Sequence, residues 1–146
     1  MKDKRVAYEK LNKFVGQWKT TGLIPASGNT PEIKIYGTDT YEWLPGSFFL
    51  MHSVDVSVGN DRNETTEIIG FDKQKDLYTM QHYDNKGNSG VMTAVCRDEV
   101  WTFLGDNLRF TGGFKEEDQE FSGVWEQSTD GINWKHFMNI KLTKTN

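Results

Sequence analysis

The stretch Lys10-Leu11-Asn12-Lys13-Phe14-Val15-Gly16-Gln17-Trp18-Lys19 decides the fold, because a helical pattern ends in it and an extended pattern begins. Glycine is common just past the last turn of a helix, since it enters the left-handed region at little cost. Gly16 therefore marks the end of a helix. Trp18 opens the extended run that follows, and a large aromatic side chain at this point can plug one end of a barrel.

An amphipathic helix is predicted over residues 4–15. Ala7, Leu11, Phe14 and Val15 recur at positions i, i+4, i+7 and i+8 and so form one apolar face. Asp3 precedes this face and is a suitable N-cap. A helix of about three turns is marginally stable alone, so it is expected to dock against the rest of the chain.

The remainder of the chain alternates between extended runs and turns. The runs cover residues 18–24, 32–44, 48–56, 65–71, 77–83, 90–97, 100–104, 108–114, 121–127 and 134–142. Short connections predict that sequence neighbours pair, and the Asp130-Gly131 step is the strongest hairpin signal. The pattern predicts an all-β fold, an up-and-down antiparallel barrel of about ten strands with a short N-terminal helix. A chain of this length is expected to form one domain, over residues 1–146.

Composition indicates which classes of partner and which cellular compartment to expect. The 146 residues carry a formal net charge of −4 with acids and lysines interspersed, which argues against nucleic acid as a partner. No apolar run approaches the ~18 residues that span a bilayer, and no signal-peptide pattern follows Met1. Cys96 is the single cysteine, so an intramolecular disulfide is excluded and a reducing, cytoplasmic location is expected. Its apolar sequence setting predicts an inert buried thiol.

Three segments resemble bacterial lipocalin-like proteins of unknown function, which belong to the calycin superfamily. They are Leu-x-x-Phe-x-Gly-x-Trp at residues 11–18, Ile-Ile-Gly-Phe-Asp at 68–72, and Ser-x-Asp-Gly-x-x-Trp at 128–134. The resemblance implies a calycin-like barrel whose helix closes one mouth. Lipocalins also place an arginine after the last strand, against the tryptophan. Here only Lys141 and Lys144 follow that strand, and Arg109 is the alternative.

Period-two alternation assigns side chains to the barrel interior. The interior set mixes large aromatics, methionine and histidine, a composition found both in ligand pockets and in packed barrel cores. The resemblance to calycins implies a ligand cavity. The predicted ligand-binding residues are Tyr78, Met80, His82, Trp101, Phe103, Trp134, His136 and Met138. The first hypothesis is therefore binding of a small, partly apolar molecule inside the barrel, without covalent chemistry.

The three histidines, His52, His82 and His136, all fall on the more apolar face of a strand, and Asp39 and Asp84 are the inward acids. The histidines lack zinc-site spacing, so separate hydrogen-bonded histidines are expected in place of a metal site. A second hypothesis is a cytoplasmic enzyme in which His82 or His136 relays protons with an acid. A third is haem binding, because nitrobindins, which are calycin relatives, bind haem through a histidine near the C-terminal end, where His136 lies.

Overall fold

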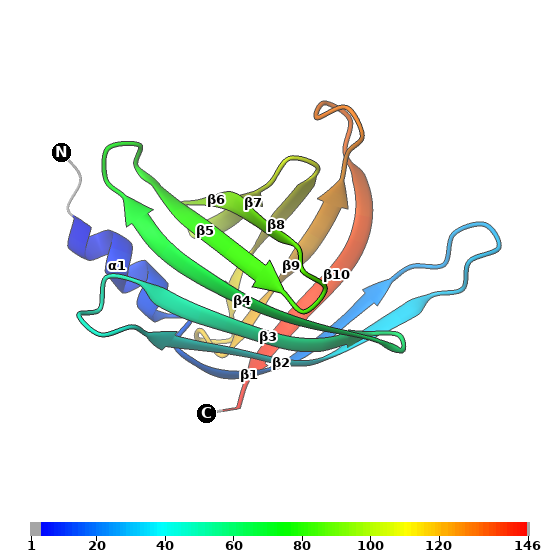
Figure 1. The fold of residues 1–146 in the computed structure, drawn as a ribbon, viewed down its shortest axis with the longest axis horizontal. Coiled ribbons are helices and arrows are strands. Elements are labelled where there is room, and N and C mark those ends of the chain that lie inside the picture. The colour runs from blue at the N-terminus through cyan, green and yellow to red at the C-terminus, as the bar shows by residue number, and fades with distance from the viewer. Residues whose placement is uncertain (1–3, 146) are drawn as a thin grey trace.

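The computed structural model describes residues 4–145, which form one helix followed by ten strands (Figure 1). The helix α1 spans Lys4–Asn12, and the Asp3 predicted to cap it lies outside the described residues. The strands are β1 (Gly16–Ile24), β2 (Ile33–Trp43), β3 (Leu50–Val58), β4 (Asp61–Asp72), β5 (Leu77–Asp84), β6 (Ser89–Arg97), β7 (Val100–Leu104), β8 (Leu108–Lys115), β9 (Glu120–Gln127) and β10 (Lys135–Lys144).

The strands close into a barrel in which sequence neighbours pair and β1 joins β10. The β1–β10 register runs from Trp18 opposite Lys144 to Leu23 opposite Asn139. Figure 1 shows the first strand beside the last. All the pairs are antiparallel. The predicted all-β, up-and-down barrel of ten strands with an N-terminal helix is therefore confirmed.

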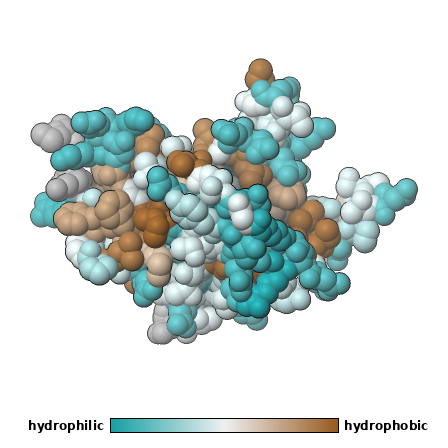
Figure 2. Space-filling view, viewed as in Figure 1, coloured by the Kyte–Doolittle hydropathy of each residue, from teal (hydrophilic) through white to brown (hydrophobic). Residues whose placement is uncertain are grey.

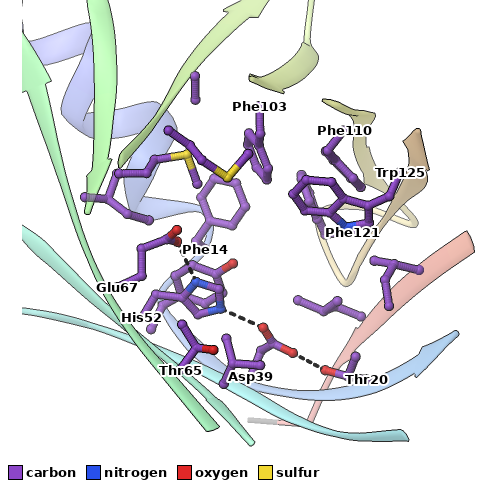
Figure 3. Close-up of a pocket in the computed structure, with 18 of the residues that line it drawn as sticks. Phe14, Thr20, Asp39, His52, Thr65, Glu67, Phe103, Phe110, Phe121 and Trp125 are labelled. Atoms are coloured by element: carbon purple, nitrogen blue, oxygen red, sulfur yellow. Dashed lines mark hydrogen bonds and ion pairs between the residues drawn. The ribbon is translucent and has the colours of Figure 1, made fainter. Parts of the chain in front are cut away.

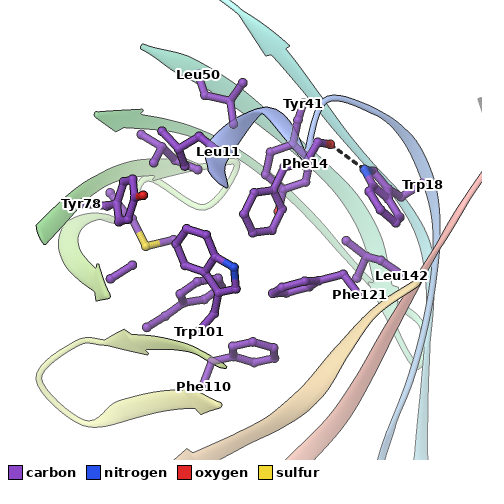
Figure 4. Close-up of a cluster of buried hydrophobic side chains, with 14 of the residues drawn as sticks. Leu11, Phe14, Trp18, Tyr41, Leu50, Tyr78, Trp101, Phe110, Phe121 and Leu142 are labelled. Atoms are coloured by element: carbon purple, nitrogen blue, oxygen red, sulfur yellow. Dashed lines mark hydrogen bonds between the residues drawn. The ribbon is translucent and has the colours of Figure 1, made fainter. Parts of the chain in front are cut away.

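The helix packs against one end of the barrel through the apolar face predicted for it. Ala7 and Leu11 of the helix and Phe14, two residues after it, are buried, and Figure 4 shows Leu11 and Phe14 among the aromatic side chains of the strands. The Phe14 ring is central, with its centroid 4.8–5.2 Å from four other rings. Those rings belong to Tyr41, Trp101, Phe114 and Phe121.

The helix ends at Asn12, three residues before the predicted end. Backbone hydrogen bonds from Phe14 to Leu11 (3.0 Å) and from Val15 to Asn12 (3.1 Å) turn the chain after its last turn. Gly16 is the first residue of β1, with a φ of 137° that side-chain-bearing residues rarely adopt. The glycine thus serves the entry to the strand, and the prediction that it caps the helix directly is wrong.

Trp18 closes the helix end of the barrel. Its side chain is 1% exposed, and its indole Nε1–H donates a 2.8 Å hydrogen bond to the carbonyl oxygen of Phe14. The ammonium of Lys144 lies 5.1 Å from the ring centroid, at the place for which the resemblance implies an arginine. Arg109 instead lies over Trp134, at 4.4 Å, so the suggestion that Arg109 takes this place is wrong.

Two connections differ from their predicted form. Gly59 and Asn60 alone connect β3 to β4, so β4 begins at Asp61 and not at residue 65. In contrast, Asp130-Gly131 lies within a seven-residue loop, 128–134, and does not form a two-residue hairpin. The Asp130 carboxylate accepts hydrogen bonds from the N–H groups of Asn133 and Ile132, each 2.8 Å long. These bonds hold the pKa of Asp130 far below its usual range, and they stabilise the loop in place of a tight turn.

A pair of glycines makes room for an aromatic ring inside the barrel. Gly112 on β8 lies opposite Gly123 on β9. A Cβ atom at Gly112 would lie 2.7 Å from Cζ of Phe110, and one at Gly123 would lie 2.6 Å from the same atom. The ring of Phe110 therefore rests on backbone, and the side chain is 1% exposed.

Exposed hydrophobic side chains gather where α1 meets the β2–β3 turn, at the left of Figure 2. Val6, Phe48 and Phe49 are about half exposed there, at 47%, 54% and 52%. Tyr8 of the helix packs edge-to-face on Phe48, with ring centroids 6.2 Å apart. Phe48 belongs to the turn, so the prediction that a strand begins at residue 48 is wrong by two residues.

Candidate functional site

The barrel encloses a cavity of about 440 Å³. Cavities that hold small molecules have volumes of roughly 300–1,000 Å³. Apolar and aromatic side chains form most of the wall, and Figure 3 shows Phe103, Phe110 and Trp125 on one side of the space. The polar side chains of the wall are Thr20, Asp39, His52, Asn63, Thr65 and Glu67. The lumen is thus an apolar chamber with one polar wall.

A histidine held between two carboxylates forms the centre of that polar wall. His52 Nδ1 lies 2.9 Å from Oε1 of Glu67, and His52 Nε2 lies 2.6 Å from Oδ2 of Asp39. The hydroxyl of Thr20 donates a hydrogen bond to Oδ1 of Asp39. The imidazole stacks on the ring of Tyr41, with centroids 3.9 Å apart and planes 8° from parallel. We call Asp39, His52 and Glu67 the polar cluster.

The register of three neighbouring strands assembles the polar cluster. Tyr41 on β2 lies opposite His52 on β3, and His52 lies opposite Glu67 on β4. Side chains of directly opposed residues share one face of the sheet. Asp39 lies two positions before Tyr41 and therefore faces the same way. A shift of one residue in either pairing would turn one member of the cluster out of the barrel.

His52 is an imidazolium at neutral pH. Burial disfavours the charged ring and acts to lower the pKa of His52, but the hydrogen bonds and charges of Asp39 and Glu67 outweigh burial and raise the pKa from 6.5 to about 9. Both ring N–H groups are therefore donors to the two carboxylates. Burial, and then the charges of Asp39 and Glu67, raise the pKa of Tyr41 well above its usual value. Tyr41 is accordingly a neutral phenol.

One carboxylate oxygen of the cluster faces the cavity without a protein partner. The Glu67 side chain is 10% exposed, and only its Oε1 takes part in a hydrogen bond among the described residues. No buried side-chain nitrogen or oxygen within residues 4–145 lacks a hydrogen-bond partner, so Oε2 retains accessible surface. Figure 3 shows the Glu67 carboxylate at the edge of the open space. The cluster thus presents a hydrogen-bond acceptor to the lumen.

Five of the eight predicted ligand-binding residues line this cavity. They are Tyr78, Met80, Trp101, Phe103 and Met138. The hydroxyl of Tyr78 is already used, because it donates a 2.8 Å hydrogen bond to the carbonyl oxygen of Ala7. The other three, His82, Trp134 and His136, are not part of the cavity wall. A binding role for the five remains a prediction.

A β-bulge explains why His136 is not inside. His136 lies opposite Glu126, and Met138 lies opposite Trp125, so β10 advances two residues while β9 advances one. The extra residue interrupts the period-two alternation of side chains. His136 is exposed and bonds Oδ1 of Asn139 through Nε2 at 2.8 Å. The assignment of His136 to the barrel interior is therefore wrong.

His82 keeps the inward face of β5, and its ring lies against Gly90 of β6. It lies opposite Glu67 but forms no ion pair or hydrogen bond with it among the described interactions. The acid predicted to accompany it, Asp84, instead accepts hydrogen bonds from the backbone N–H groups of Lys86 and Asn88. Among the described residues no hydrogen bond therefore joins His82 to Asp84 or Glu67, and a His82 proton relay stays a prediction.

Neither His136 nor His52 is placed to ligate a haem iron inside the lumen. His136 lies outside the lumen, and both nitrogens of His52 are hydrogen-bonded to carboxylates. Neither residue offers a free nitrogen to an iron atom in the cavity. Within residues 4–145, no group of three or more His, Cys, Asp or Glu side chains is arranged to hold a metal ion.

Cys96 lies outside the lumen, in a second hollow lined in part by Val6, Lys10 and Tyr78. The thiol is half-buried, and burial raises its pKa despite the nearby lysines. A raised pKa keeps the sulfur as a thiol and lowers its reactivity. The single helix within residues 4–145 is too short and too polar to cross a membrane.

The polar cluster was only partly foreseeable from the sequence. Alternation along the strands places Asp39 and His52 on inward faces without showing that they meet, and Glu67 and Thr20 were not among the predicted residues. The signal for Glu67 was present, because this acid shares the alternation of Ile69 and Phe71 on the same strand. Thr20 carries no such signal, since a threonine is ordinary on either face of a strand.

Comparison with known proteins gives a family and a fold. The family model described as "Protein of unknown function (DUF1579)" matches residues 5–105. Among solved structures, the crystal structure of Rv2717c from M. tuberculosis is similar, with a TM-score of 0.66 and 10% sequence identity, over 96% of this chain and 98% of that chain. At this identity the likeness shows the fold alone. No curated protein matches this chain.

Proposed function

This chain belongs to the DUF1579 family of proteins of unknown function, and we propose that it binds a small, partly apolar molecule inside its barrel. The observation that carries the proposal is the opening of a buried polar cluster onto a cavity of about 440 Å³ with mostly apolar walls. Such a chamber can bury an apolar body and orient it through a few polar contacts. The ligand's polar end would lie against Glu67.

The cost of burying the cluster supports this function. Two carboxylates and an imidazolium inside a barrel carry a large desolvation penalty, and well-packed apolar side chains would give equal or greater stability. The cluster is next to the cavity and is not enclosed in packed core. A role in recognising a ligand accounts for keeping such a set of charges there.

Binding is favoured over proton-transfer chemistry by the hydrogen bonds of His52. Both of its nitrogens bond carboxylates of the protein, so neither is available to exchange a proton with a molecule in the lumen.

We also propose that the barrel is of the calycin type implied by the lipocalin-like motifs. The single cysteine, Cys96, supports a reducing, cytoplasmic location.

The first test measures uptake of Nile red, an uncharged dye whose fluorescence rises in apolar surroundings. Met138 lines the cavity, so the larger side chain of Met138→Trp fills part of the lumen and is expected to weaken dye binding by at least about tenfold. Asn139→Trp is the matched control, since Asn139 is the exposed neighbour on the same strand. It should bind the dye as wild type does.

Circular dichroism and thermal melting establish that both variants are folded. The proposal predicts one dye site per chain in wild type and in Asn139→Trp, and loss of that site in Met138→Trp. Absence of dye binding to wild type, or equal binding by the two tryptophan variants, would show that the lumen is not a binding chamber.

A further inference from the structure

The wall of the lumen carries more negatively charged than positively charged side chains. Asp39, Glu67 and His52 belong to its wall, and no lysine or arginine within residues 4–145 does. Two carboxylates and one imidazolium leave one negative charge in excess. Buried charges are weakly screened and act strongly on a molecule beside them. The lumen therefore attracts cations and repels anions.

The hydrogen bonds of the cluster give the same preference. The imidazolium has two N–H donors, and both are used within the cluster. Both oxygens of Asp39 are already engaged, because Oδ2 accepts from His52 and Oδ1 accepts from Thr20. Within the cluster, the one carboxylate oxygen without a hydrogen bond is Oε2 of Glu67, on a side chain that is nine-tenths buried. A ligand group that contacts this atom must donate to it, and a carboxylate cannot.

The walls around the cluster also suit a cation. Aromatic rings attract positive charge to their faces, most strongly where water is excluded. Phe14, Tyr41 and Trp101 line the cavity and are each no more than 5% exposed. His82, which lies opposite Glu67 in the sheet, forms no ion pair with it, so no second cation is supplied to the cluster from within residues 4–145.

From these contacts we infer that the ligand is a protonated amine with an apolar body, whose ammonium group donates to Glu67 while its body lies among the aromatic side chains. The inference rests on the proposed function and deepens it by giving the ligand a charge. It also sets this lumen apart from one built to hold carboxylates such as fatty acids, since such a lumen needs a cationic or donor group where this one has Glu67.

The test compares three molecules that share one ring system and differ in charge. These are 1-naphthylmethylamine, 1-naphthylmethanol and 1-naphthoate, titrated at pH 7 by calorimetry and by displacement of Nile red. Because a hydrogen bond to a charged partner is stronger than a neutral one, the amine should bind at least about tenfold more tightly than the alcohol. The acid should bind most weakly of the three.

Glu67→Gln removes the charge while keeping the shape, and it should reduce the preference for amine over alcohol to about threefold or less. Glu64→Gln is the matched control, because Glu64 lies on the same strand with its side chain 46% exposed to solvent. It changes the net charge equally and should keep the wild-type preference. If Glu67→Gln does not fold, the wild-type series still decides the question.

The outcomes distinguish failure of the amine inference from failure of the proposed binding function. Binding of Nile red together with equal or tighter binding of the acid would overturn the inference and leave the proposed function standing. Retention of the full amine preference in Glu67→Gln would also overturn it. Failure of Nile red to bind wild type would remove the proposed function itself, and the inference with it.

Discussion

Replacing Trp18 by alanine is expected to lower the free energy of unfolding by about 3–5 kcal/mol, the usual cost of truncating a large aromatic in a core. The side chain is 1% exposed, and it ties the segment after the helix to the last strand. The change removes the ring, its hydrogen bond to Phe14 and its contact with Lys144. Because a typical domain is stable by only about 5–15 kcal/mol, the loss is a large part of the total.

Urea unfolding followed by circular dichroism measures this effect, and two further variants resolve its parts. Trp18→Phe keeps a ring but loses the Nε1–H donor, so it should cost less than Trp18→Ala. Tyr83→Ala is the control, because Tyr83 is 56% exposed, and it should change stability by no more than about 0.5–1 kcal/mol. A cost below about 1 kcal/mol for Trp18→Ala would show that the tryptophan is not the plug of the barrel.

Replacing His52 by alanine is expected to cost about 3–5 kcal/mol at pH 7, as breaking a buried ion pair does. The variant leaves Asp39 and Glu67 facing the same space with no cation between them. His136→Ala is the control, since His136 is exposed and bonds only Asn139. It should alter stability by no more than about 0.5 kcal/mol.

The pH dependence identifies the cause of the His52 effect. The pKa of His52 is raised on folding from 6.5 to about 9, so its stabilising contribution is fully present below pH 6.5 and is lost as the pH rises through 9. A rise of this size corresponds to roughly 3 kcal/mol. The gap in unfolding free energy between wild type and His52→Ala should therefore shrink by about that amount between pH 6 and pH 10.

Chemical denaturation at several pH values provides the measurement. Groups remote from His52 titrate alike in both proteins and cancel in the difference, which confines it to His52 and the two carboxylates that it bonds. A gap that stays constant from pH 6 to pH 10 would contradict the account of the polar cluster. So would a His52→Ala variant no less stable than His136→Ala.

The fold was predictable because its signals are local and repeated. Gly16 and Trp18 mark the change from helix to strand, the apolar face of residues 7, 11 and 14 requires a docking surface, and short turns force neighbouring strands to pair. The error at the β9–β10 connection lies where a local signal met a competing contact. Asp130 uses its side chain to accept hydrogen bonds from the loop backbone, and this loop replaces the expected tight hairpin.

The site was less predictable because it depends on register and on an irregularity in one strand. Asp39, His52 and Glu67 come from three strands, and alternation places each of them inside without saying which of them meet. Their meeting follows from the pairing of Tyr41 with His52 and of His52 with Glu67. His136 was misplaced because the β-bulge before Met138 reverses its face, and no glycine or proline in residues 135–138 marks it.

The most direct test of ligand binding in the lumen uses the methionine methyl groups as reporters. Met80, Met92 and Met138 line the cavity, whereas Met51 lies between the inward-facing Leu50 and His52 and so points out of the barrel. Protein labelled with carbon-13 at the methionine methyls is titrated with Nile red and followed by NMR. The account predicts that the signals of Met80, Met92 and Met138 shift together and saturate at one dye per chain, while that of Met51 stays in place. Unchanged signals from all three lumen methionines, or a shift of Met51 alone, would contradict it.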